Sequence, residues 1–146
     1  MNWKKRAILL VVFTSIFGSS VANAGTNRYV RMDIIRHIES GNNPRAWNKH
    51  EDGRGLYQIN PVCLKEYNNF HSLKYTKDDL WNPEVNSKIA IWYVEVRIPQ
   101  LLRHYKQEVN TRNIIICYNA GIRAVLKGYV PVTTKQYLVK YETMSR

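Results

Sequence analysis

The chain has 146 residues, and its 22 lysines and arginines against 11 aspartates and glutamates give a formal net charge of +11. This length favours a single domain, because a second one would have too little chain for its own core. A composition of 45% hydrophobic and 23% charged residues excludes a disordered or fibrous protein. Two cysteines are too few for a disulfide-stapled scaffold or a four-cysteine zinc site.

The first 24 residues have the pattern of a cleaved signal peptide. Three basic residues, Lys4 to Arg6, precede an apolar run over residues 7–17, and Ala22-Asn23-Ala24 fits an A-x-A cleavage site. An uncleaved membrane anchor is the less favoured alternative, because the apolar run is too short to span a bilayer. We therefore predict an exported protein, periplasmic or secreted, whose mature part is residues 25–146. This part is expected to be a monomer without a stable membrane anchor.

The mature part is basic, because 19 lysines and arginines stand against all 11 acidic residues. Such a charge attracts polyanions, which include nucleic acid, anionic lipid and acidic cell-wall polymers. The basic residues are scattered between Arg28 and Arg146 and form no stripe along one helix. This pattern and the predicted export argue against nucleic acid as the partner. A charge that only keeps the protein soluble remains the alternative.

Helical patterns dominate the mature part. Residues 28–40 form an amphipathic pattern with Ile34, Ile35 and Ile38 on one face, ended by Gly41-Asn42-Asn43-Pro44. A loop follows, with a short strand expected at residues 56–59. Further helices are expected at 61–67, at 83–105 with a kink or break at Pro99, and at 111–118, 122–127 and 134–143. The predicted class is mainly α with one small β element.

Glu39 is the first candidate for chemistry. It lies at the end of the first predicted helix, next to an apolar face. Partial burial would raise the pKa of this carboxyl group and keep it protonated near neutral pH. A protonated glutamate in a cleft is the general acid that glycosidic cleavage needs. By position alone, a solvated surface glutamate is the more common outcome.

Five short motifs in a fixed order favour a functional role for Glu39 over that of a surface glutamate. They are Glu39-Ser40, Gly55-Leu56-Tyr57-Gln58-Ile59, Asn82-Pro83, Tyr118-Asn119-Ala120-Gly121 and Tyr137-Leu138-Val139. The series resembles the soluble lytic transglycosylase (SLT) family of the lysozyme superfamily over residues 34–140. Each motif alone is weak, whereas all five in order are specific.

The resemblance implies a mainly helical, lysozyme-like fold (α+β) with a cleft for peptidoglycan glycan strands. It implies cleavage of the β-1,4 bond between N-acetylmuramic acid and N-acetylglucosamine, with Glu39 as the single acid and base. The product would carry a 1,6-anhydro end. No metal or cofactor is implied, and no metal-ligand spacing occurs in the sequence. Small members often open the wall for secretion, conjugation or pilus machines, which are the implied partners.

Further site residues follow from the resemblance, position by position. Gln58 matches the glutamine that lines the cleft, and Gly55 matches the glycine before it. Tyr118 matches a tyrosine that faces the acid, with Asn119 beside it. Asn48 stands where many members have a substrate-binding serine, and Tyr57 replaces the usual methionine on the cleft floor.

A lysozyme-type hydrolase is the nearest alternative, because such enzymes use a second carboxylate. Glu51 and Asp52 are its candidates, although Asp52-Gly53 is also an ordinary turn pair. A catalytically silent peptidoglycan-binding module is the alternative from another class. His37-Ile38-Glu39 matches the H-x-E of zinc deaminases, but the required P-C-x-x-C partner is missing.

Two smaller predictions concern cysteines and aromatic residues. Cys63 and Cys117 would form a disulfide in an oxidising compartment or remain two buried thiols, and the sequence favours neither. Trp47, next to Asn48, is the one aromatic residue that we expect to contact a sugar.

Overall fold

The structure, a computed structural model, describes residues 29–146. The predicted signal peptide and its cleavage site lie outside this range. Helices dominate the described residues, as predicted. The α-helices are α1 (Met32–Ser40), α2 (Pro61–His71), α3 (Pro83–Trp92), α4 (Ile98–His104), α5 (Thr111–Ala120), α6 (Ile122–Leu126) and α7 (Val132–Met144). They are joined by strands β1 (Trp47–Asn48) and β2 (Gly53–Arg54), the 3₁₀ turn η1 (Asp78–Trp81) and the π turn η2 (Tyr93–Arg97).

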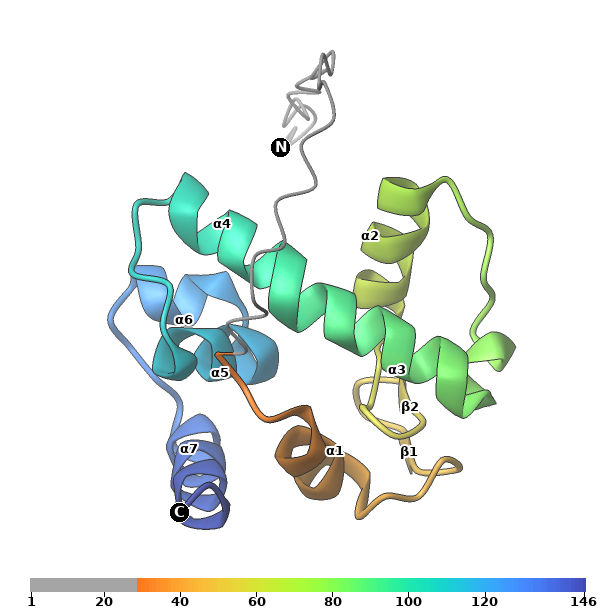
Figure 1. Cartoon of the computed structure of the whole chain (residues 1–146), viewed down its shortest axis with the longest axis horizontal. Helices are drawn as coiled ribbons and strands as arrows, with labels where there is room; N and C mark the ends of the chain where they lie inside the picture. The colour runs from red at the N-terminus through yellow and green to blue at the C-terminus, as the bar shows by residue number, and fades with distance from the viewer. Residues whose placement is uncertain (1–28) are drawn as a thin grey trace, which may run out of the picture.

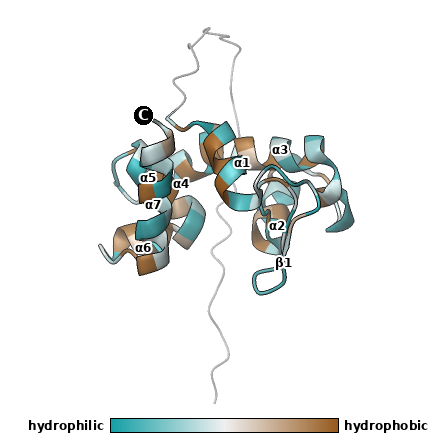
Figure 2. Cartoon of the chain, turned by 90° about the horizontal axis from the view of Figure 1, so that it is seen from below, coloured by the Kyte–Doolittle hydropathy of each residue, from teal (hydrophilic) through white to brown (hydrophobic). Residues whose placement is uncertain are grey.

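The helices form two groups on either side of α1. Figure 1 shows α3 and α4 as one long rod, with α2 and the strands toward one end and α5, α6 and α7 toward the other. Figure 2 shows α1 between these groups. The core runs along the rod, and its fully buried side chains include Ile35, Ile89, Ile98, Leu102, Ile114 and Ile115.

Helix α1 follows the predicted pattern but begins at Met32. Its buried residues are Ile34 and Ile35. The helix ends at Gly41, whose left-handed backbone (φ 60°) lets its N–H bond to the carbonyl of His37. Glu39 therefore lies in the last turn of a helix whose end is sharply defined.

The β element differs from the prediction in position. Strands β1 and β2 pair antiparallel, with Trp47 opposite Arg54 and Asn48 opposite Gly53. Residues 56–59 do not form a strand, and only Ile59 bridges back to Arg54. The reason is the backbone, because Gly55 (φ 76°) and Gln58 (φ 51°) both adopt left-handed conformations that turn the chain.

The long helix does not end at Pro99. The chain stays helical from Pro83 to His104, and the π turn η2 lies just before the proline. In this turn the N–H of Ile98 reaches back to the carbonyl of Tyr93. Proline lacks an N–H and its ring crowds the preceding turn, and a locally widened turn accommodates both effects. The two predicted Asn-Pro helix starts are confirmed, since Asn60 and Asn82 cap α2 and α3 with their side chains.

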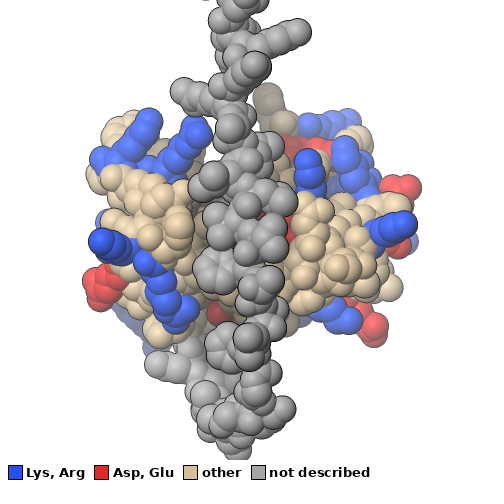
Figure 3. Space-filling model, turned by 90° about the horizontal axis from the view of Figure 1, so that it is seen from above, with Lys and Arg blue, Asp and Glu red and all other residues tan. Residues whose placement is uncertain are grey.

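Charge is distributed unevenly along the described chain. Residues 98–146 contain eight lysines and arginines but only two acidic residues, Glu108 and Glu142. Residues 29–97 contain ten basic and nine acidic residues. On the face drawn in Figure 3, the charged side chains at one end are mostly blue, whereas blue and red are mixed at the other end. Within residues 29–146, no helix is long and apolar enough to cross a membrane.

Asn86 joins α3 to the chain after β2. Its side chain is fully buried, accepts a hydrogen bond from the N–H of Tyr57 (2.9 Å), and donates to the carbonyls of Arg54 (2.7 Å) and Leu80 (3.0 Å). Gly55 lies directly against it, since a Cβ at this position would be 2.4 Å from Asn86 Nδ2. A side chain at residue 55 would therefore push the loop away from α3.

We predict that Asn86→Ala lowers the free energy of unfolding by about 3 kcal/mol, because the buried Tyr57 N–H and Leu80 carbonyl lose their partner and the Arg54 carbonyl loses one of two. Urea denaturation measures the loss. Asn69→Ala, an exposed asparagine on α2, is the control and should change the stability by no more than about 0.5 kcal/mol. Equal unfolding midpoints for both variants would contradict the role assigned to Asn86.

Candidate functional site

Glu39 holds a proton near neutral pH. Its carboxyl group is half-buried in the last turn of α1, and burial is the main cause that raises its pKa to about 7. The negative charge of Glu51 raises the pKa further, whereas a hydrogen bond from Tyr137 lowers it. Among the described residues, Glu39 is the one carboxyl group with a clearly raised pKa.

Tyr137 of α7 is the direct partner of this carboxyl group. Its hydroxyl donates to Oε1 of Glu39 over 2.8 Å. Burial and the nearby Glu39 raise the pKa of Tyr137 well above its usual range. The phenol therefore keeps its proton and remains a donor at every physiological pH. The two residues are 98 positions apart in the sequence. Because the Tyr137 hydroxyl is bonded to Oε1, Oε2 is the oxygen of Glu39 that Tyr137 does not contact.

The loop after β2 is held by hydrogen bonds from several helices. Ser40, next to Glu39, donates to the carbonyl of Leu56 over 2.8 Å. Tyr118 of α5 donates to the carbonyl of Tyr57 over 2.6 Å. With the bonds from Asn86, this loop connects α1, α3 and α5, so the end of α1 is held in place relative to the rest of the site.

Tyr118 was predicted to face the acid. Burial, with a smaller contribution from the charge of Glu39, raises the pKa of Tyr118 well above its usual range. Its hydroxyl, however, bonds to the Tyr57 carbonyl rather than to the carboxyl group, which bonds to Tyr137. Tyr118 therefore lies within electrostatic reach of Glu39 and supports the loop.

Gln58 and Tyr57 also have defined positions. The side chain of Gln58 donates to the carbonyls of Ala46 and Gly55 and accepts from the N–H of Asn48, so all three bonds hold the hairpin together. The side chain of Tyr57 is 5% exposed and belongs to the core, which leaves its ring little surface for a sugar. Tyr57 takes part in the site through its backbone.

Asn119 is exposed at the end of α5, and its orientation is set by Thr134 of α7. The hydroxyl of Thr134 donates to Oδ1 of Asn119 over 2.7 Å. Thr134 is itself only 1% exposed. Because Oδ1 is occupied, Asn119 presents its amide N–H groups as donors, and an acceptor such as an N-acetyl carbonyl would complement them.

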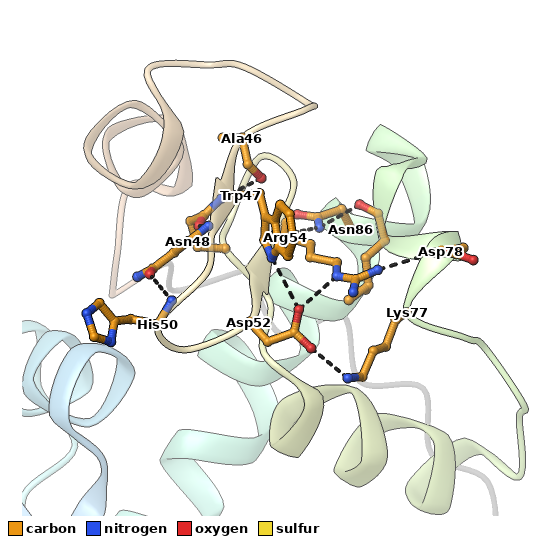
Figure 4. Close-up of polar contacts among 11 residues, drawn as sticks. Ala46, Trp47, Asn48, His50, Asp52, Arg54, Lys77, Asp78 and Asn86 are labelled. Atoms are coloured by element: carbon orange, nitrogen blue, oxygen red, sulfur yellow. Dashed lines mark hydrogen bonds and ion pairs between the residues drawn. The ribbon is translucent and has the colours of Figure 1, made fainter.

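Asp52 is bound by two cations and the Trp47 indole at the hairpin. Figure 4 shows it between Trp47, Arg54 and Lys77, while His50 lies on the opposite side. Asp52 accepts from Lys77 over 2.6 Å, from Arg54 over 3.0 Å and from the Trp47 indole over 3.3 Å. The bonds from Lys77 and Arg54 lower its pKa to about 2, so it is ionised and neutralised. Glu51 is exposed and acts on Glu39 through its charge.

Trp47 and Asn48 lie on β1 and point to opposite sides of the hairpin (Figure 4). The ring of Trp47 is half exposed, and the cations of Lys49 and Arg54 lie over it at 5.3 Å and 5.9 Å. Asn48 is exposed, and its side chain accepts from the N–H of His50. A sugar contact through Trp47 remains a prediction.

Cys63 and Cys117 are free thiols in the structure, and both are buried. Burial raises their pKa values to about 12 and about 11. They are therefore protonated, unreactive packing groups in this state. Within residues 29–146, no group of three or more histidine, cysteine, aspartate or glutamate side chains is placed to hold a metal ion.

No role is predicted for Tyr137 or Thr134 from the sequence, although Tyr137 begins the last motif and Thr134 lies three residues before it. Their spacing contains a usable signal, because residues 134, 137, 138 and 141 repeat at helical intervals and all are buried. A polar threonine and two tyrosines on the buried face of a helix need hydrogen-bond partners. That requirement indicates a polar site beneath α7.

Comparison with known proteins identifies the family of the chain. The family model described as the transglycosylase SLT domain matches residues 20–136, more than three quarters of the chain. Its match begins inside the predicted signal peptide and ends one residue before Tyr137. Neither the curated proteins nor the solved structures gave a match. The chain belongs to the transglycosylase SLT domain family, whose members act on peptidoglycan.

Proposed function

We propose that the protein is a lytic transglycosylase that cleaves the β-1,4 bond between N-acetylmuramic acid and N-acetylglucosamine. The observation that carries this proposal is the carboxyl group of Glu39, whose pKa is raised to about 7 by burial and which is bonded to Tyr137 through one oxygen. Since Tyr137 donates to Oε1, the proton is carried on Oε2. This oxygen is the group that would face the glycosidic bond.

The reaction balances with this one carboxyl group. Oε2 of Glu39 gives its proton to the glycosidic oxygen as the bond to C1 of the muramyl residue breaks. The resulting carboxylate takes the proton of the muramyl C6 hydroxyl, and the C6 oxygen closes onto C1. The 1,6-anhydro product forms, and Glu39 is protonated again. A pKa of about 7 suits a group that serves as acid and then as base.

The surroundings favour this path over hydrolysis with a second carboxylate. Asp52 is paired with Lys77 and Arg54, so both of its carboxylate oxygens already have cationic partners. Glu51 is the remaining candidate for a hydrolase, because its charge acts on Glu39. Cleavage next to an envelope-spanning secretion, conjugation or pilus machine is the setting that we propose from the family and the small size.

Mass spectrometry of the fragments released from purified peptidoglycan tests the proposal. We expect anhydro-muramyl ends from residues 25–146 and a loss of roughly 10³-fold in rate for Glu39→Gln. Reducing ends, lost in Glu51→Gln, would indicate a hydrolase instead. Binding to peptidoglycan without release of fragments would indicate a binding module.

The pH dependence tests the Tyr137 bond. Activity should fall as the pH rises through about 7, because the acid must be protonated. Tyr137→Phe removes a bond that stabilises the carboxylate, so the pKa of Glu39 rises and the fall moves to higher pH. We also expect roughly tenfold less activity, since the carboxyl group is less well oriented.

Tyr141→Phe is the matched control on the same helix, because the Tyr141 hydroxyl bonds to the N–H of Arg31 and not to Glu39. The Tyr141→Phe variant should lose activity at the same pH as the wild-type protein. A Tyr137→Phe profile that falls at the wild-type pH would contradict the assignment.

Thr134 tests whether Asn119 is positioned for substrate. Thr134→Val keeps the shape but removes the bond to Asn119, and we expect KM to rise about fivefold with a smaller change in kcat. Thr134→Ser keeps the hydroxyl and should restore KM. Steady-state kinetics on soluble glycan strands measure both constants, and identical constants for the two variants would reject the positioning role.

A further inference from the structure

A pocket lies where α1 meets α7, and none of its lining residues belongs to the site described above. Its volume is about 420 Å³, within the range of roughly 300–1,000 Å³ that is usual for small-molecule sites. Apolar groups make up much of its lining, and a cationic lysine lies among them. The lining residues are His37, Ile38, Val139, Lys140, Thr143 and Met144.

The pocket lies close to Glu39 along both helices. Ile38 is the residue before Glu39 on α1. Lys140 comes three residues after Tyr137 on α7, which is less than one helical turn of 5.4 Å. Because Tyr137 and Glu39 are hydrogen-bonded, the same two helices carry the acid and the pocket lining.

The surrounding charge favours an anionic occupant. Lys140 belongs to the part of the chain, residues 98–146, with eight basic and two acidic residues. Within the described chain, none of these eight forms an ion pair, whereas Arg31, Arg54, Lys77 and Arg97 of the other part do. The field over α7 is therefore not neutralised by the protein itself.

We propose that the α1–α7 pocket binds the stem peptide of the muramyl residue next to the cleaved bond, with Lys140 facing a peptide carboxylate. This inference rests on the proposed function. Stem peptides combine small apolar side chains with free carboxylates, and the pocket pairs the apolar groups of Ile38, Val139 and Met144 with Lys140. The site would make peptide-bearing strands better substrates than bare ones.

The test compares cleavage rates on glycan strands that carry peptides with rates on the same strands stripped by an amidase. The quantity measured is the ratio of the two rates. We expect Lys140→Gln to lower this ratio at least threefold, because the carboxylate loses its cation. Lys135→Gln is the matched control, since Lys135 is exposed on the same helix but does not line the pocket.

A second variant tests the space rather than the charge. Val139 is 61% exposed, so Val139→Trp should fold and fill the pocket, and it should lower the ratio as well. A ratio that stays at the wild-type value in both Lys140→Gln and Val139→Trp would overturn the proposal. A fall of the same size in Lys135→Gln would also overturn it, because general charge would then explain the preference.

A binding measurement separates this proposal from the proposed reaction. Calorimetric titration of the Glu39→Gln protein with a soluble N-acetylmuramyl peptide needs no cleavage. We expect binding that Lys140→Gln weakens at least threefold and that N-acetylmuramic acid alone does not reproduce. If the wild-type protein cleaves neither substrate but this binding occurs, the proposed peptide site is supported and the proposed reaction is rejected. Absence of binding overturns the pocket whatever the cleavage assay gives.

Discussion

The backbone of the loop after β2 is the constraint on which the site depends. Its N–H and carbonyl groups are bonded by Asn86 of α3, Ser40 of α1 and Tyr118 of α5. A loop with left-handed residues at Gly55 and Gln58 cannot satisfy these groups by regular strand pairing. Side chains from three helices do so instead, and in return the loop fixes where those helices lie relative to one another.

The chemistry of Glu39 follows from that arrangement. Ser40 is bonded to the loop, so the last turn of α1 is held and the preceding carboxyl group lies under α7. Burial in this position raises the pKa, and the Tyr137 bond partly offsets the rise. The two effects leave Glu39 with a pKa near neutral pH, whereas Asp52 is kept ionised by Lys77 and Arg54. Different surroundings thus give two carboxyl groups different properties.

The prediction of the fold succeeded where local chemistry dominates. The Asn-Pro pairs at residues 60–61 and 82–83 begin helices because their caps act within a few residues. The strand predicted at residues 56–59 failed, because apolar composition does not reveal the left-handed backbone at Gly55 and Gln58. The irregularity predicted near Pro99 takes the form of a π turn just before the proline, within a chain that stays helical. The backbone at Gly55 is decided by packing against a distant residue, Asn86 of α3.

The order of motifs in the sequence by itself determined the family, the helical class and Glu39 as the candidate acid, because these depend on residue identity and short spacing. Only the tertiary structure decided which side chains reach that acid. Tyr137 lies 98 residues from Glu39 and Thr134 lies 15 residues from Asn119, and no local pattern pairs them. Their contacts arise because α7 packs on α1 and α5. The pKa of Glu39 and the pocket beside it therefore belong to the packed helices, since burial and charge are set by neighbours in space.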